Sequence, residues 1–204
     1  MNTELIKKNS QYKSILTVLN GNDWLLFMAT FVRRINPVTI IFWLYLGSLL
    51  VAFLISIFAF NLMLLNSRIW IIGIIGGLLL SLLVTPILHE FIHSFFYKLL
   101  GAKKVVFKWS KRLLRFNIYS SDFVLSKKNY YVISLVAFLL FSVTPFTLSF
   151  FFNNVLFLLL QSLSIFHSFY ALKDLAVCSY LYKHHNSYLH IGQDERAVFY
   201  KNIE

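Results

Sequence analysis

Four long runs of apolar residues dominate the hydrophobic pattern of the chain. They extend over about Val38–Leu65, Ile69–Leu100, Tyr131–Phe152 and Val155–Tyr182. A helix needs about 20 predominantly apolar residues to cross the hydrocarbon core of a bilayer, and each run is long enough. The pattern therefore predicts an all-α membrane protein with about four transmembrane helices.

The segments around these runs divide the chain into three parts. Residues 1–37 form an N-terminal segment, residues 38–182 the four-helix transmembrane domain, and residues 183–204 a hydrophilic tail. In the first part, the apolar run Trp24–Val32 is too short to span a bilayer. It is either an interfacial helix or a poorly ordered lead-in.

The loop between the second and third spans, residues 101–130, is basic and contains two β-rich stretches. These are Val105–Trp109 and Leu114–Tyr119, separated by Ser110-Lys111-Arg112. Two such stretches joined by a short polar connection are typical of a hairpin. We expect a short cytoplasmic β-hairpin near the membrane surface.

The composition agrees with a membrane protein. Hydrophobic residues make up 58% of the 204 residues and charged residues 13%, whereas a soluble domain has about 25% charged residues. This excludes a disordered chain and an ordinary cytosolic domain. The single cysteine, Cys178, allows neither an internal disulfide nor a metal site built from thiolates alone.

The distribution of the positive charge predicts the orientation. The net charge of +11 is gathered in the N-terminal segment, the 101–130 loop and the tail, whereas the opposite ends of the spans carry only Arg68. Lysine and arginine collect on the cytoplasmic side of membrane proteins. We expect a multi-pass protein of the cell membrane with both termini cytoplasmic. Its basic segments would contact the lipid bilayer, and no nucleic-acid partner is expected.

The second span contains the sequence His89-Glu90-Phe91-Ile92-His93. On a helix, His89 and His93 lie one turn apart, so both imidazoles can hold one metal ion, and Glu90 can take a proton from metal-bound water. Ionisable groups within a span are costly, which favours a functional role for all three. The alternative is a polar cluster that only joins helices.

A catalytic zinc site needs a third protein ligand. Leu99 stands where the extended soluble-protease motif has a further histidine, and no glutamate occurs in a later span. Asp174 remains, nine residues before Lys183, just as His89 lies nine residues before Lys98. Nine residues are about 13 Å of helix, so both groups are expected at a similar depth. The alternative for Asp174 is an ion pair with its neighbour or a hydrated carboxylate.

Other histidines compete for this role. His167 lies on nearly the same helix face as Asp174 but about 10 Å deeper, so we expect it to be a partner of a metal ligand or a residue lining the cavity. It would reach the same ion only if its helix were broken or strongly tilted. His184, His185 and His190 are expected to be solvated in the tail.

Small and helix-breaking residues surround the motif. Gly73 and Gly77, followed by Ser81, indicate either a face for close helix packing or ordinary glycines of a membrane helix. Pro86 and Pro145 each remove a backbone hydrogen bond and are expected to kink or open their helices.

The chain resembles the zincin peptidase family of small bacterial membrane proteins and, more distantly, the site-2 proteases. The resemblance rests on the sequence from Leu88 to Ser94, its continuation Leu99 to Val105, a basic loop, a proline-bearing span and a final span with an aspartate. It implies a Zn²⁺ ion held by His89, His93 and Asp174, with Glu90 as the general base.

These features predict an integral-membrane zinc metallopeptidase of the HExxH, site-2-protease-like type. It would hydrolyse a peptide bond in or near the membrane through a zinc-bound water activated by Glu90. Its partner would be a membrane-spanning or membrane-proximal peptide substrate. The alternative is a non-enzymatic membrane protein with a structural or regulatory metal site that acts through a partner.

Overall fold

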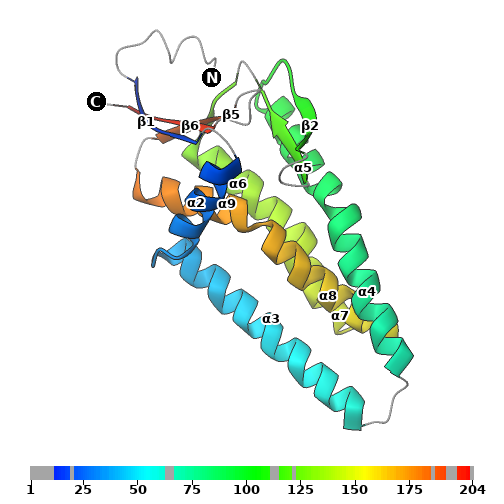
Figure 1. Cartoon of the computed structure of the whole chain (residues 1–204). Helices are drawn as coiled ribbons and strands as arrows, with labels where there is room; N and C mark the ends of the chain where they lie inside the picture. The colour runs from blue at the N-terminus through cyan, green and yellow to red at the C-terminus, as the bar shows by residue number, and fades with distance from the viewer. Residues whose placement is uncertain are drawn as a thin grey trace.

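Helices make up most of the described chain in the computed structural model (Figure 1). The structure describes residues 12–18, 21–62, 67–110, 115–120, 123–184, 187–191 and 197–202. Some residues of the basic segments and of the tail lie outside these ranges, namely Lys7, Lys8, Lys111, Arg112, His185 and Arg196.

Within the described residues, three helical stretches are long and apolar enough to cross a membrane, and a bent pair of helices adds a fourth if it counts as one span. The three stretches are Pro37–Phe58, Trp70–Leu99 and Lys127–Ser149, and the bent pair is Val155–Tyr170 with Leu172–Lys183. The prediction of about four spans is confirmed at this level.

The spans are built from α3 (Pro37–Leu62), α4 (Ser67–Leu83), α5 (Thr85–Leu99), α6 (Lys127–Phe138), α7 (Thr144–Ser149), α8 (Asn154–Tyr170) and α9 (Leu172–Lys183). Figure 1 shows α3 on one side of the bundle and α4 on the other, with α8 between them. The first and last strands lie together at one end of the bundle, and the turn from α7 to α8 lies toward the other.

Both intramembrane prolines mark interruptions of a helix. Pro86 lies in the first turn of α5, directly after the break at Val84 that separates α4 from α5. Pro145 lies at the start of α7, directly after a π-helical turn, η1 (Leu139–Val143). In that turn the Thr144 N–H donates to the Leu139 carbonyl. A proline removes one N–H from the regular pattern, and a π turn is one local adjustment to that loss.

The glycines of α4 allow close contact with α8. A methyl group added at Gly77 would lie 2.5 Å from the Leu159 carbonyl oxygen and 2.9 Å from the Leu163 nitrogen, and one at Gly73 would lie 2.8 Å from the Leu158 Cβ. These neighbours are backbone atoms or atoms next to the backbone, so they move only if the helix moves. Gly73 and Gly77 therefore form a face for close helix packing. Of the two interpretations offered by the sequence, this one is confirmed, and that of ordinary membrane-helix glycines is not.

The fold is not entirely helical. A four-stranded antiparallel sheet has the order β1 (Tyr12–Val18), β6 (Ala197–Asn202), β5 (Ser187–Ile191), β4 (Leu125–Ser126). The expectation of an all-α protein with one hairpin missed this sheet. Its strands come from both ends of the chain, and β1 pairs with β6 from Tyr12 opposite Asn202 to Val18 opposite Ala197. A second, two-stranded sheet pairs β2 (Val106–Ser110) with β3 (Arg115–Tyr119).

The expectation that His190 is solvated was wrong. This residue lies in β5, is 7% exposed, and its Nδ1 lies 3.1 Å from the Phe123 carbonyl oxygen. The tail is not solvated at this point, because β5 lies between β6 and β4 in the sheet and four of its five residues are buried.

An aromatic cluster joins this sheet to the helices. Phe27 and Phe31 of α2 (Gly21–Val32) contact Tyr180 of α9, and Phe199 of β6 lies 4.4 Å from Tyr180, measured between ring centroids. The run Trp24–Val32 is thus part of a helix, and that helix packs on α9. The sheet and α2 together pack against the C-terminal half of α9.

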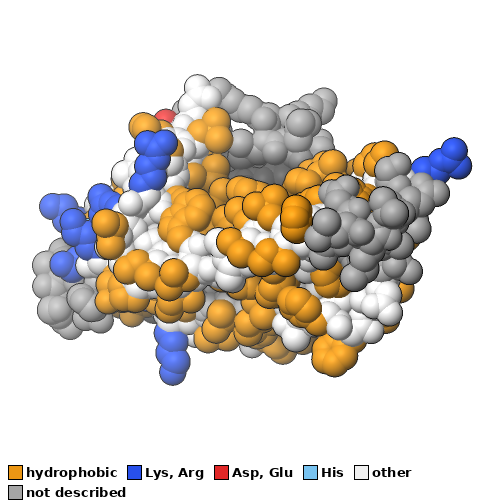
Figure 2. All heavy atoms as spheres, turned by 90° about the horizontal axis from the view of Figure 1, so that it is seen from below, with side chains coloured by type: hydrophobic (Ala, Val, Ile, Leu, Met, Phe, Trp, Pro, Cys, Tyr) orange, Lys and Arg blue, Asp and Glu red, His pale blue; other side chains and the backbone are white. Residues whose placement is uncertain are grey.

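The other end of the molecule presents a largely hydrophobic surface (Figure 2). Lysine and arginine side chains appear only at the margins of this view. Along the helices, many large apolar side chains are exposed, including Leu54 and Phe58 on α3 and Leu82 and Leu83 on α4. Such a surface suits a lipid environment.

Gly77→Ala should destabilise the protein by about 1–3 kcal/mol, because the new methyl group would meet the backbone of α8. Thermal unfolding in detergent measures this change. Gly47→Ala is the matched control, since a methyl group there would have no neighbour within 4 Å and stability should be unchanged or slightly higher. Equal unfolding of the Gly77 variant and the wild type would contradict close packing of α4 on α8.

Candidate metal centre

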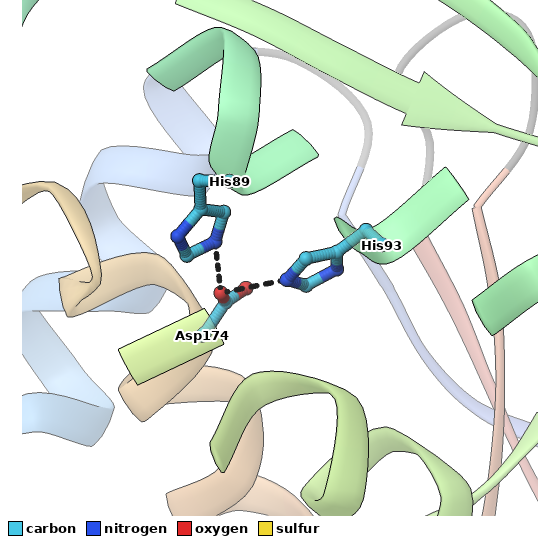
Figure 3. A group of neighbouring side chains, drawn as sticks. All are labelled: His89, His93 and Asp174. Atoms are coloured by element: carbon cyan, nitrogen blue, oxygen red, sulfur yellow. Dashed lines mark hydrogen bonds and ion pairs between the residues drawn. The ribbon is translucent and has the colours of Figure 1, made fainter. Parts of the chain in front are cut away.

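Three side chains from two helices that are far apart in the sequence meet inside the bundle (Figure 3). His89, His93 and Asp174 each offer one ligand atom, and these atoms lie within 4.8 Å of one another. The Asp174 Oδ2 is 2.8 Å from the His89 Nε2 and 3.3 Å from the His93 Nε2. The residues His89, His93 and Asp174 are 2%, 6% and 7% exposed, respectively. These are the residues that sequence analysis selected as metal ligands.

Helix α5 supplies both histidines and Glu90. Its buried positions include Thr85, His89, His93 and Tyr97, which are spaced four residues apart and therefore form one face. The two imidazole rings on this face are stacked, with centroids 4.8 Å apart. The helix thus presents both rings to α9, as the spacing of the motif predicts.

The bend between α8 and α9 brings Asp174 to this face. The two helices meet at Ala171 with a bend of 48°, and Asp174 lies in the first turn of α9. The first turn of a helix stabilises a negative charge because backbone N–H groups point toward it. This break places the Asp174 carboxylate beside His89, which precedes it by 85 residues.

Tyr130 orients the carboxylate. The Tyr130 hydroxyl donates to the Asp174 Oδ1 at 2.8 Å, which leaves Oδ2 directed at the two histidines. Sequence analysis did not identify Tyr130, because a tyrosine at the start of a span is equally typical of the aromatic belt at the membrane interface.

Glu90 lies next to the group of three ligands. Its side chain is buried, and its Oε1 accepts a hydrogen bond from the Tyr170 hydroxyl at 3.2 Å. Tyr170 is the last residue of α8, so the bend that positions Asp174 also holds the partner of Glu90. No pattern in the sequence pointed to Tyr170.

His167 contacts the opposite side of the His89 ring. The His167 Nε2 lies 3.0 Å from the His89 Nδ1, and the His167 Nδ1 lies 2.7 Å from the Ser142 Oγ. His167 is therefore beside a candidate ligand and outside the group of three. The estimate that it lies about 10 Å deeper assumed a straight helix, and the bend at Ala171 invalidates that assumption.

Residues 82–189 match a family described as Putative zincin peptidase, which covers more than half of the 204 residues. The chain belongs to this family. The matched region includes the His89-to-His93 motif, Tyr130, His167 and Asp174. No curated protein and no solved structure matches the chain.

Tyr130→Phe should lower the stability in detergent by about 1.5–3 kcal/mol, because it removes a hydrogen bond to a buried carboxylate. Tyr131→Phe is the control on the same helix, since that hydroxyl donates to the neutral carbonyl of Cys178 and should contribute about 0.5–1.5 kcal/mol. Chemical unfolding measures both variants. A smaller loss for the Tyr130 variant than for the Tyr131 variant would contradict the role assigned to Tyr130.

Proposed function

We propose that this protein is an integral-membrane zinc metallopeptidase that hydrolyses a peptide bond in or near the membrane. The observation that carries the proposal is the buried contact of His89 and His93 with Asp174, with Glu90 beside it. Membership of the zincin peptidase family supports the reaction class.

The donor set fits zinc. Two imidazole nitrogens and one carboxylate oxygen are common protein ligands of catalytic zinc, and a fourth position is left for water or substrate. The His93 Nε2 is buried and makes no hydrogen bond within the described residues, although it points at Asp174. A metal ion would satisfy this nitrogen. Zinc bound here would polarise a peptide carbonyl and make water a stronger acid.

The side chains of the site would then have separate roles in holding the ion and in transferring the proton. His89, His93 and Asp174 hold the ion, and Tyr130 keeps Oδ2 of Asp174 turned toward it. Glu90 accepts the proton of the attacking water and passes it to the departing amine. Burial excludes bulk water from these groups, which strengthens their electrostatic interactions.

An apolar groove beside the candidate site favours a membrane-embedded segment as the substrate. It lies between α3, α6 and α9, has a volume of about 340 Å³, and reaches Asp174. Its walls include Ile41 and Phe42 of α3 and Leu135 and Phe138 of α6. An apolar side chain of a membrane-spanning substrate could occupy the groove while the adjoining peptide bond lies near the carboxylate.

The proposed orientation places the sheet and both described ends of the chain in the cytoplasm. Lys13, Lys127, Lys183 and Lys201 belong to this end of the molecule, whereas Arg68 begins α4 at the other end. This distribution follows the positive-inside rule. The candidate metal centre then lies toward the cytoplasmic side of the bilayer, and a substrate would reach it from that half.

Glu90→Gln should abolish cleavage while zinc binding is retained, because the amide has the same shape but accepts no proton. The expected loss is about 100-fold or more. The measurement is cleavage of a panel of single-span model substrates in proteoliposomes, beside the zinc content of the same preparations. Cleavage at the wild-type rate by the glutamine variant would contradict the mechanism.

The purified wild-type protein should contain about one zinc ion per chain, and both His93→Ala and Asp174→Ala should lose it. Elemental analysis of detergent-purified protein measures this directly. Ser94→Ala is the control, because Ser94 is buried on the same helix and lies outside the ligand group. Zinc retained by the Asp174 variant would show that another residue is the third ligand.

Near-complete burial of the ligands also favours the alternative of a structural or regulatory metal site, since structural zinc sites are closed. In that case His93→Ala would lower the stability, whereas Glu90→Gln would leave the function in cells unchanged. The two proposals therefore differ in what happens when Glu90 alone is altered.

A further inference from the structure

A chain of buried polar groups leads from the candidate metal centre across the bundle to α3. It runs from the His89 Nδ1 to the His167 Nε2 at 3.0 Å, and from the His167 Nδ1 to the Ser142 Oγ at 2.7 Å. The Ser142 carbonyl accepts a hydrogen bond from the Ser164 Oγ at 2.7 Å, and the Tyr45 hydroxyl lies 2.9 Å from the same oxygen of Ser164. Four segments thus contribute to one connected network.

The available hydrogens determine which groups donate in the contacts between Tyr45, Ser164 and Ser142. Ser164 has one hydroxyl hydrogen and donates it to the Ser142 carbonyl. The Tyr45 hydroxyl must therefore be the donor in its contact with Ser164. Tyr45 and Ser164 together hold the backbone of Ser142, which lies in the π turn before Pro145. Ser142, Ser164 and His167 are all 0% exposed, so their positions are set by these partners.

The contacts of His167 with His89 and Ser142 affect which ring nitrogen of His89 carries its hydrogen. A neutral imidazole carries one hydrogen, so His89 can offer Nε2 as a metal ligand only when its hydrogen is on Nδ1. That hydrogen then needs an acceptor, and the His167 Nε2 is 3.0 Å away. In that state a neutral His167 carries its own hydrogen on Nδ1, and the Ser142 Oγ, 2.7 Å away, is the acceptor within reach.

We propose that His167 is a positioning residue that accepts the Nδ1 hydrogen of His89 and thereby keeps the His89 Nε2 available to the metal ion. Ser142 holds His167 in this state. The inference rests on the proposed metal-binding function and assigns His167 a role distinct from that of a ligand, because both of its ring nitrogens already have partners.

Loss of His167 should weaken metal binding for a specific reason. Without an acceptor at Nδ1, the other tautomer of His89 is favoured, since its Nε2 hydrogen can be donated to the Asp174 Oδ2 at 2.8 Å. The metal would have to displace that hydrogen and leave Nδ1–H buried without a partner. Changes to such supporting partners of ligating histidines lower metal affinity by about 10–100-fold.

The experiment compares the zinc dissociation constants of detergent-purified variants by competition with a chelator. His167→Leu should bind zinc about 10–100-fold more weakly than the wild type. His167→Gln should recover most of the affinity, because its amide oxygen can accept the same hydrogen. Ser142→Ala is a milder change and should lie between the wild type and the leucine variant.

Two controls separate positioning from general damage to the fold. Ser149→Ala removes a hydroxyl of a residue that is also 0% exposed in the same span. Among the described residues this hydroxyl bonds only the nearby Phe146 carbonyl, so the zinc affinity of the variant should equal that of the wild type. X-ray absorption spectroscopy of the zinc-loaded His167→Leu variant should still count two histidine ligands.

The outcomes distinguish this inference from the proposed function. If the wild type binds no zinc, the proposed function fails, and the inference fails with it. If the wild type binds zinc and both His167→Leu and Ser142→Ala bind it equally well, the inference alone is overturned. Loss of one histidine ligand in the spectrum of the leucine variant would also overturn it, because His167 would then be a ligand.

Discussion

A carboxylate buried in an apolar bundle has to be stabilised by partners from its own protein, since the membrane interior supplies no water. Asp174 meets this requirement with one oxygen toward Tyr130 and the other toward His89 and His93. Removing one partner of a buried ion pair typically costs about 3–5 kcal/mol. Helices α5 and α6 supply these partners to Asp174 of α9.

The rest of the bundle brings these helices within reach of one another. Gly73 and Gly77 allow α4 to lie against the backbone of α8, so α5, which continues α4, passes close to the end of α8. There the bend at Ala171 turns Asp174 toward the histidines and leaves His167 on the other side of the His89 ring. Close packing and the break in the helix thus act together.

The sheet stabilises the end of the molecule at which the candidate site lies. It pairs the beginning and end of the described chain, and its residue Phe199 packs on Tyr180 six residues beyond Asp174. The last helix is therefore held on both sides, by the bend at its start and by the aromatic cluster near its end. The family match covers residues 82–189, so β1, α2, α3 and β6 are elements outside it.

The sequence by itself determined the long apolar runs that give about four candidate spans, and it selected Glu90 and the three residues His89, His93 and Asp174 that the structure brings together. These follow from local properties, namely the length of apolar runs, the spacing of two histidines on a helix, and the scarcity of ionisable residues in the spans. Asp174 could be selected as a candidate ligand from the sequence because the apolar runs contain few acidic residues.

Only the tertiary structure decided the sheet and the partners of Asp174 and Glu90, and it decided between the two roles expected for His167 by placing its ring against His89. Strand β1 becomes a strand by pairing with β6 at the far end of the chain, and the hydroxyls of Tyr130, Tyr170 and Ser142 become functional candidates through their contacts. The bend of 48° between α8 and α9 alters which residues of this pair of helices face the same neighbour. Such relations depend on distances between residues far apart in the chain, which local periodicity does not encode.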